Sequence, residues 1–331
     1  MAPVGRVRAV LKVARRRTAW WNWAGTVLGL GLLGLVVARS DPASVWAVWR
    51  EGDPRWVAAG AGLYFVAPWL RAWRWQLLLG QVARPGRPEL FGLTLAGYAL
   101  NNLIPGRAGD LARITLLSLR HRLPWPTVGA TALAERVLDG LSLVGLLFLG
   151  LGLTRFPGWG FLAGLVGAGV FLGTLILAWA TLKFAPEGPR GLRRVIGQVR
   201  RGLMGLGRPD VLGASGLLTL ASWAVEAGVF FCVGRALGLG LGPSEYLVVA
   251  SVGNLAWALP LAPGGAGSFD LAVREAAAAL GAGPEAAAFG LLVHLVLWLP
   301  VTVAGIIWLG WYGALLLPEA GPSGPADRGT D

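Results

Sequence analysis

The sequence carries very little charge for its length. Only 14% of its 331 residues are Asp, Glu, Lys or Arg, whereas 55% are hydrophobic. Soluble proteins carry about 25% charged residues, so too many segments of this chain would lack a water-facing side. The composition therefore excludes an ordinary soluble enzyme. Because one membrane-spanning helix needs about 20 apolar residues, the length leaves room for roughly six to eight spans with short loops.

Cysteine and histidine are almost absent. The single cysteine, Cys232, lies in an apolar run and has no intramolecular partner, and two histidines give no metal-ligand spacing. No Walker A lysine followed by Ser or Thr comes after a glycine loop. The pattern Gly29-x-Gly31-x-x-Gly34 lies inside an apolar run without a preceding strand, which excludes a dinucleotide site. Neither a metal nor a cofactor is expected.

Long apolar runs dominate what is present, and they predict an all-α polytopic membrane protein with about six full spans. The first run suggests a signal peptide with cleavage near Val36-Val37-Ala38, but its length and three early tryptophans favour a retained helix. Most of the 17 tryptophans lie near run ends, as in an interfacial belt. The predicted spans are Trp20–Val37, Trp56–Leu79, Thr127–Leu153, Trp159–Leu182, Val211–Leu239 and Ala286–Trp311.

Two shorter runs end in related Pro-Gly motifs. The run Phe91–Ile104 stops at Pro105-Gly-x-Ala-Gly109, and Tyr246–Ala262 stops at Pro263-Gly-x-Ala-Gly267. A helix-like segment follows each motif, at Leu111–Leu119 and Ser268–Leu280. Each motif also has a proline 21 residues on and a basic or titratable residue 31 residues on, namely Pro126 and Arg136, then Pro284 and His294. We predict two re-entrant hairpins in repeat units of about 88–182 and 244–317.

The distribution of basic residues supports this topology. With both motifs as hairpins, 19 Lys and Arg residues fall on the side of the N-terminus, from 1–18, 71–90, 120–126 and 183–210, and four fall opposite. If Phe91–Ile104 spanned fully, the basic loop 183–210 would lie outside, against the positive-inside rule. The N-terminus is thus predicted to be cytoplasmic, and the two hairpins form an inverted repeat, an architecture found in transporters. Most of the net charge of +12 is accordingly explained by basic segments on the cytoplasmic side and does not indicate nucleic-acid binding.

A few charges fall inside predicted membrane segments. Glu135, Arg136 and Asp139 lie on one span, with the two carboxylates four residues apart on one helix face. Charge at membrane depth costs about 2.5–3.5 kcal/mol on insertion scales and normally faces a partner or a cavity. Two interpretations stay open, which are an ion-pair network that locks helices together and a polar path or headgroup site. Glu226 and Arg235 are secondary candidates, and each of them taken alone is better explained by a structural role.

The first motif is cationic and the second is not. Arg107 and Arg113 are suited to clamp a phosphate, and Asp110 to cap a helix or pair with arginine, although a plain tight turn with a capped helix also fits. The second motif instead carries Ser268 and Asp270, with Arg274 and Glu275 further on. His294 is a lone imidazole on an apolar helix, and we interpret it as a residue that packs in the interior.

Three segments in order resemble the transmembrane region of lysylphosphatidylglycerol synthases, a family with many standalone flippase-like members. They are Asn101–Asp110, Glu135–Asp139 and Pro263–Asp270, and the resemblance covers about residues 20–315. It implies movement of a lipid to the outer leaflet. The aminoacyl transfer of full-length synthases belongs to a separate soluble domain, which this chain is expected to lack. The sequence departs from the pattern at Asp270, where Glu is expected, and at His294, where Arg is expected.

These observations predict an ATP-independent flippase or transporter of a phospholipid or lipid-linked substrate in the bacterial inner membrane. Its partner would be an anionic or aminoacylated phospholipid or a lipid-linked glycan, with no nucleic acid. Alternatives are a membrane-embedded polyprenyl-pyrophosphate phosphatase and a structural subunit of an envelope complex. We expect a basic cytoplasmic segment over 1–18, one transmembrane domain over 19–317 and a disordered tail over 318–331. The candidate substrate-binding residues are Asn102, Pro105, Gly106, Arg107, Gly109, Asp110, Arg113, Glu135, Arg136, Asp139, Pro263, Gly264, Gly267 and Asp270.

Overall fold

The structure, a computed structural model, describes residues 19–184, 188, 190–259 and 262–316, and this part of the chain is helical without strands. The segments expected to be a basic N-terminus and a disordered tail lie outside the described residues. The elements are α2 (Ala19–Ala38), α3 (Pro42–Glu51), α4 (Pro54–Tyr64), α5 (Val66–Leu79), α6 (Arg87–Leu103), α7 (Ala108–Arg120), α8 (Trp125–Leu153), α9 (Gly158–Phe184), α10 (Gly191–Leu203), η1 (Met204–Gly207), α11 (Pro209–Ala236), α12 (Pro243–Trp257), η2 (Pro263–Gly265), α13 (Ser268–Ala279), η3 (Gly283–Glu285) and α14 (Ala286–Leu316).

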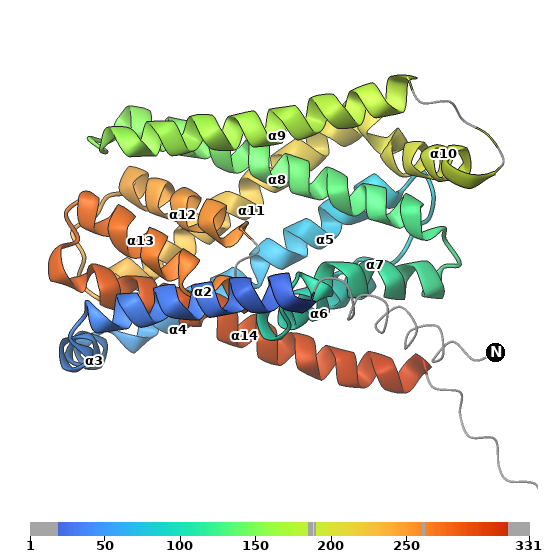
Figure 1. The fold of residues 1–331 in the computed structure, drawn as a ribbon. Helices are drawn as coiled ribbons and strands as arrows, with labels where there is room; N and C mark the ends of the chain where they lie inside the picture. Colours follow the sequence, from blue (N-terminus) through green and yellow to red (C-terminus); the bar gives the residue numbers. More distant parts are fainter. Residues whose placement is uncertain (1–18, 185–187, 189, 260–261, 317–331) are drawn as a thin grey trace, which may run out of the picture.

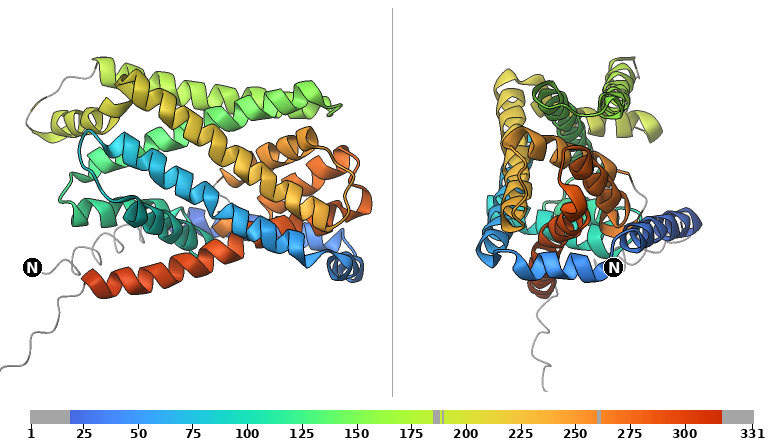
Figure 2. Two further views of the ribbon diagram at one scale, coloured as in Figure 1. Left: turned by 180° about the vertical axis from the view of Figure 1, so that it is seen from behind. Right: turned by 90° about the vertical axis from the view of Figure 1, so that its left-hand side faces the viewer.

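The long helices run side by side, and their connections gather at two opposite ends (Figures 1 and 2). α10 and the α5–α6 and α7–α8 connections lie at one end, whereas α3 and the α8–α9, α11–α12 and α13–α14 connections lie at the other. Within the described residues, four helices are long and apolar enough to cross a membrane, and a fifth crossing is possible if α2 and α3, bent by 77°, form one span. The chain is therefore an all-α integral membrane protein.

The structure confirms only part of the number of membrane spans that the sequence predicts. The predicted second span, Trp56–Leu79, consists of two shorter helices, α4 and α5, which meet at Phe65. The predicted basic loop 183–210 contains the short helix α10, with basic residues along most of its length. Sixth and further crossings remain a prediction.

Proline and aspartate explain where many helices begin. Six of them, α3, α4, α6, α8, α11 and α12, carry proline within their first two positions, where the missing N–H costs no hydrogen bond. Asp41 accepts from the N–H groups of Ala43 and Ser44 to cap α3, and Asp53 accepts from Arg55 to cap α4. These caps and prolines fix the short turns that return the chain into the bundle.

Two helical hairpins point toward each other from opposite ends of the bundle. α6 and α7 form the first and α12 and α13 the second, and their open ends lie at different ends of the molecule (Figure 1). The two tips approach closely, because a methyl group on Gly264 would lie 3.5 Å from the Cα of Asn102. The first hairpin packs against α14 through α6, and the second packs against α2 through α13.

An aromatic cluster holds the second hairpin in the bundle. Phe230 of α11 lies edge-on to Phe269 of α13 and Phe289 of α14, with ring centroids 6.1 and 6.3 Å apart. Tyr246 of α12 contacts Phe289 at 6.0 Å. All four rings are buried. Such pairs add about 0.5–1.5 kcal/mol each beyond their buried area, so this part of the fold forms a firm support for the second tip.

The first hairpin depends on a close backbone crossing at Gly109. A Cβ at this position would collide with the carbonyl oxygen of Gly97 on α6. Gly109→Ala is therefore expected to open the hairpin and lower stability by about 1–3 kcal/mol, the usual cost of overpacking. The matched control is Gly145→Ala in α8, where nothing lies within 4 Å of the new methyl group. Thermal unfolding in detergent tests this pair, and equal melting temperatures for the two variants would contradict the assignment.

Candidate functional site

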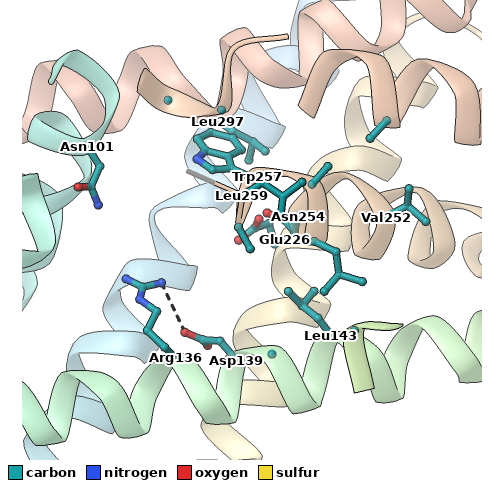
Figure 3. A pocket seen from close by; sticks show the side chains of 18 of the residues that line it. Asn101, Arg136, Asp139, Leu143, Glu226, Val252, Asn254, Trp257, Leu259 and Leu297 are labelled. Carbon is teal, nitrogen blue, oxygen red and sulfur yellow. Dashed lines mark ion pairs between the residues drawn. The ribbon is translucent and has the colours of Figure 1, made fainter. Parts of the chain in front are cut away.

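A cavity of about 870 Å³ lies between the two hairpin tips and helices α8, α9 and α11. One part of its wall is charged and the other is apolar. Figure 3 shows Arg136 and Asp139 projecting from α8 toward Trp257 and Leu259 beside the second tip. The charged lining residues are Arg71, Arg107, Arg136, Asp139 and Glu226, and the apolar wall from α8 and α9 includes Leu143, Leu147, Leu162, Val166, Val170 and Phe171.

Arg74 of α5 is the centre of a buried ion-pair network. Its guanidinium contacts both carboxylate oxygens of Asp139, at 2.6 and 3.1 Å, and reaches Oε1 of Glu135 at 3.3 Å. It also donates to the hydroxyl of Thr219 on α11 at 2.8 Å. Glu135 and Asp139 thus share one face of α8, as their spacing predicts. This face joins α8 to α5 in the interior.

The same network ties the first hairpin to α8. Arg113 of α7 pairs with Oε2 of Glu135 at 3.0 Å, and its guanidinium lies over the ring of Trp75, 4.6 Å from the ring centroid. A second pair joins the same two helices, because Arg136 of α8 donates to Asp110 of α7 at 2.9 Å. Arg113 and Asp110 lie one turn apart, with 3.4 Å between Nε and Oδ1. These side chains therefore form an ion-pair network, and Arg136 and Asp139 of this network also line the cavity.

A second ion pair also lines the cavity. Arg71 of α5 donates to Glu226 of α11 at 2.8 Å and to the hydroxyl of Tyr98 at 3.0 Å, and its guanidinium lies over Trp223. The sequence assigned Arg71 and Arg74 to a cytoplasmic basic segment, which is wrong. They are only 8% and 2% exposed, because α5 continues inward and both side chains turn to carboxylates on α8 and α11.

Arg107 links the first tip to the second hairpin. It begins α7 in the left-handed region, with φ of 53°, a strained conformation for a residue other than glycine. Its guanidinium donates to the carbonyl oxygens of Ala258 and Trp257 at 2.7 and 3.4 Å. These carbonyls belong to the end of α12, where helical partners run out. The nearest oxygen of Asp110 is 3.9 Å away.

His294 of α14 holds the second tip. Its Nδ1 lies 2.8 Å from Oδ1 of Asp270, and its Nε2 lies 3.1 Å from the carbonyl oxygen of Gly264. The other oxygen of Asp270 accepts from the N–H of Gly267 at the start of α13. The carbonyl oxygen of Gly264 can only accept, so Nε2 donates in that contact. His294 thus has two polar partners, which a histidine used only for packing would lack.

The structure brings half of the predicted site residues onto the cavity wall. The lining members are Asn102, Gly106, Arg107, Arg136, Asp139, Pro263 and Gly264. Of the others, Asp110, Arg113 and Glu135 belong to the ion-pair network, Gly109 and Gly267 permit close backbone approach to Gly97 and Gly29, and Asp270 holds His294. Pro105 forms the turn before Gly106 without lining the cavity.

Several site residues were not found from the sequence. Arg71, Arg74, Tyr98, Trp223 and Asn254 line the cavity or complete its ion pairs. The available signal was the i,i+3 spacing of Arg71 and Arg74 inside the predicted span, which places both on one helix face. Among the residues the structure describes, no three His, Cys, Asp or Glu side chains are grouped to hold a metal ion. Arg235 is exposed near the end of α11, away from the network.

Comparison with known proteins identifies the family of this chain. A family profile described as "Lysylphosphatidylglycerol synthase TM region" matches residues 22–305. The chain belongs to this family. Among curated proteins, it is 29% identical to "Glycosyltransferase AglD" of Haloferax volcanii over 327 aligned residues, which cover 85% of this chain and 52% of AglD. It is also 29% identical over 116 residues to a "UPF0104 membrane protein" of Methanothermobacter thermautotrophicus, covering 34% of each chain. The alignments therefore cover about half the length of AglD and about a third of the second relative.

Proposed function

We propose that this protein is an ATP-independent flippase or transporter that moves a phospholipid or lipid-linked substrate across the bacterial inner membrane. The observation that carries the proposal is the cavity between the hairpin tips, which is charged on one side and apolar on the other. A lipid has the same division between headgroup and acyl chains. Charged side chains at membrane depth, facing a cavity, are typical of substrate paths.

The short lengths of the hairpin helices support a re-entrant arrangement. α7 has 13 residues and α13 has 12. At 1.5 Å per residue they extend only about 20 and 18 Å, short of the about 30 Å of a bilayer core. Broken helices that meet near the midplane from opposite sides form an inverted repeat in many transporters. We infer this relation for units 88–182 and 244–317, with irregular backbone at the tips tolerated because protein surrounds it.

The basic residues support an orientation. Lys183 and most arginines of the segment 183–210, together with Arg84, Arg87, Arg120 and Arg122, belong to the end of the bundle that carries α10. The opposite end has fewer basic residues in the part of the chain that the structure describes: Arg39, Arg50, Arg55 and Arg155, with the exposed Arg235 at the end of α11. The positive-inside rule then makes the α10 end cytoplasmic. The N-terminus belongs to this side in the same scheme.

The cavity and the relatives suggest how a lipid would bind. The headgroup would enter among Arg107, Arg136 and Asp139, while the acyl chains would lie along the apolar wall of α9, whose Leu162 and Val166 are about 60% exposed. AglD is named a glycosyltransferase, so a lipid-linked glycan is one candidate substrate, besides phospholipids. The reaction named for AglD itself is not proposed for this chain.

Arg136→Ala is expected to slow lipid crossing by about tenfold, equivalent to ~1.4 kcal/mol on the barrier. The test is a leaflet-sidedness assay in liposomes with fluorescent phosphatidylglycerol and a membrane-impermeant quencher. Arg155→Ala, at an exposed arginine of the opposite end, is the matched control. Equal crossing with wild type and Arg136→Ala would contradict the site, and crossing no faster than in protein-free vesicles would contradict the function.

A further inference from the structure

The charges around the cavity do not balance. The network contains five arginines but four carboxylates, namely Arg71, Arg74, Arg107, Arg113 and Arg136 against Asp110, Glu135, Asp139 and Glu226. Arg71 and Glu226 neutralise each other. The remaining four arginines share three carboxylates, so one positive charge is in excess within the network. Excess charge is costly at membrane depth unless a further partner joins it.

The excess charge faces the cavity. Arg74 and Arg113 have side chains only 2% and 5% exposed, and each is enclosed by its carboxylates. Arg107 and Arg136 are 37% and 38% exposed, and both line the cavity. They also meet at the same carboxylate, because Asp110 lies 3.9 Å from Arg107 and 2.9 Å from Arg136. Two partly exposed guanidinium groups therefore share one carboxylate that Arg113 also contacts.

The carboxylates at the cavity wall are already occupied. Arg74 binds both oxygens of Asp139, and Arg71 binds Glu226. Among the residues that the structure describes as lining the cavity, no carboxylate is left without an arginine partner. A cationic headgroup would have to displace one of these buried pairs, and breaking such a pair costs about 3–5 kcal/mol.

Arg107 is the arginine that can change partner most easily. At hydrogen-bond distance it binds only uncharged carbonyl oxygens at the end of α12. A guanidinium gains more from a phosphate, because charge-assisted and bidentate hydrogen bonds are roughly twice as strong as neutral ones. Exchange of the carbonyls for a phosphate would also release the contact between the first tip and the second hairpin.

We infer that the cavity selects a lipid whose headgroup carries a net negative charge, with its phosphate held between Arg107 and Arg136. The inference rests on the proposed lipid transport and names the substrate class for it. The phosphate supplies the missing negative charge, and the acyl chains occupy the apolar wall from α9. A lipid with a net cationic aminoacyl headgroup is disfavoured, because the cavity offers it an excess of positive charge.

The test is equilibrium binding to purified protein in an uncharged detergent, measured by isothermal titration calorimetry. The probes are dioctanoyl phosphatidylglycerol, its lysyl ester, dioctanoylglycerol, inorganic phosphate and glycerol 3-phosphate. We expect the anionic lipid to bind at least about tenfold more tightly than every other probe, since loss of one charge-assisted pair costs about 1.4 kcal/mol or more. Equal binding of the anionic lipid and its lysyl ester would overturn the inference. If inorganic phosphate or glycerol 3-phosphate binds as tightly, the cavity recognises a free phosphate and the lipid assignment is overturned.

Arg107→Gln should weaken binding of the anionic lipid by about tenfold or more, with Arg107→Lys between it and wild type. Arg155→Gln is the exposed control and should bind as wild type. The comparison among probes uses the unaltered protein, so it decides the question even if Arg107→Gln does not fold. Unchanged binding by folded Arg107→Gln would overturn the assignment of this residue.

Leaflet crossing measured on the same preparations separates this inference from the proposed function. Selective anionic binding that requires Arg107, without lipid crossing, would support the headgroup site and contradict transport. Rapid crossing of anionic and lysyl lipids alike, unaffected by Arg107→Gln, would support transport and overturn the headgroup inference.

Discussion

Arg74→Met is expected to destabilise the protein by about 3–5 kcal/mol, the usual effect of removing one partner from a buried ion pair. Arg74 is 2% exposed and contacts Asp139 through two nitrogens and Glu135 through one. Methionine keeps much of the side-chain length but leaves two carboxylates short of a cation. Denaturant unfolding in detergent micelles, followed by tryptophan fluorescence, gives the change in free energy.

Two further variants separate the charge effect from a packing effect. Arg74→Met combined with Glu135→Gln and Asp139→Asn should recover much of the lost stability, because the buried charges are removed together. Arg84→Met, at an exposed arginine of the α5–α6 connection, should lie within about 0.5 kcal/mol of wild type. Arg74→Met with wild-type stability would show that the network does not hold α5 to α8.

The helices and the hairpin tips could be read from the sequence because their causes are local. Long apolar runs require helices in a membrane, where every backbone polar group needs an internal partner. The first Pro-Gly motif directly follows α6, which ends at Leu103, and Gly106 adopts positive φ at that turn. The second motif does not stop α12, because that helix already ends at Trp257, before Pro263. The break between α4 and α5 at Phe65 was not predicted, although Pro68 marks it, because proline cannot donate to the carbonyl oxygen of Tyr64 at the end of α4.

The partners of the buried charges could not be read in the same way. The spacing of Glu135 and Asp139 places both on one face of α8, but their cation, Arg74, is 65 residues from Asp139 in the chain. An arginine near the end of an apolar run has the same local pattern whether it extends to the interface or turns inward. Only the packing of α5 against α8 and α11 decides between these directions. The positive-inside argument survives because it depends on other basic residues, mainly those of 183–210.

The second hairpin shows the same limit. Asp270 was assigned from the motif to substrate binding, and His294 to packing, because no short-range pattern joins α13 to α14. In the structure the two residues form a pair that also holds the carbonyl of Gly264. The imidazole occupies the position where the family resemblance places an arginine. This departure from the family pattern therefore keeps a nitrogen-bearing partner beside Asp270.

His294→Phe is expected to lower the free energy of unfolding by about 1–3 kcal/mol, the usual cost of leaving a buried polar group unsatisfied, because the carboxyl group of Asp270 loses its imidazole partner. The side chain of Asp270 is fully buried, and its remaining contact is the N–H of Gly267. The carbonyl of Gly264 loses its donor as well, so the second tip should loosen at the cavity wall. Denaturant unfolding in detergent measures the loss, and limited proteolysis at the tip reports the local effect.

His294→Arg should keep most of the stability, because a guanidinium can donate to both the carboxylate and the carbonyl. His294→Phe combined with Asp270→Asn should be more stable than His294→Phe alone, since an amide costs less than a carboxyl group when it is buried without its imidazole partner. Leu295→Phe, at an exposed neighbour on α14, controls for the added ring. If His294→Phe and Leu295→Phe cost the same, the histidine acts through packing alone. If His294→Arg is as unstable as His294→Phe, the two polar contacts of the imidazole are not what the second tip requires.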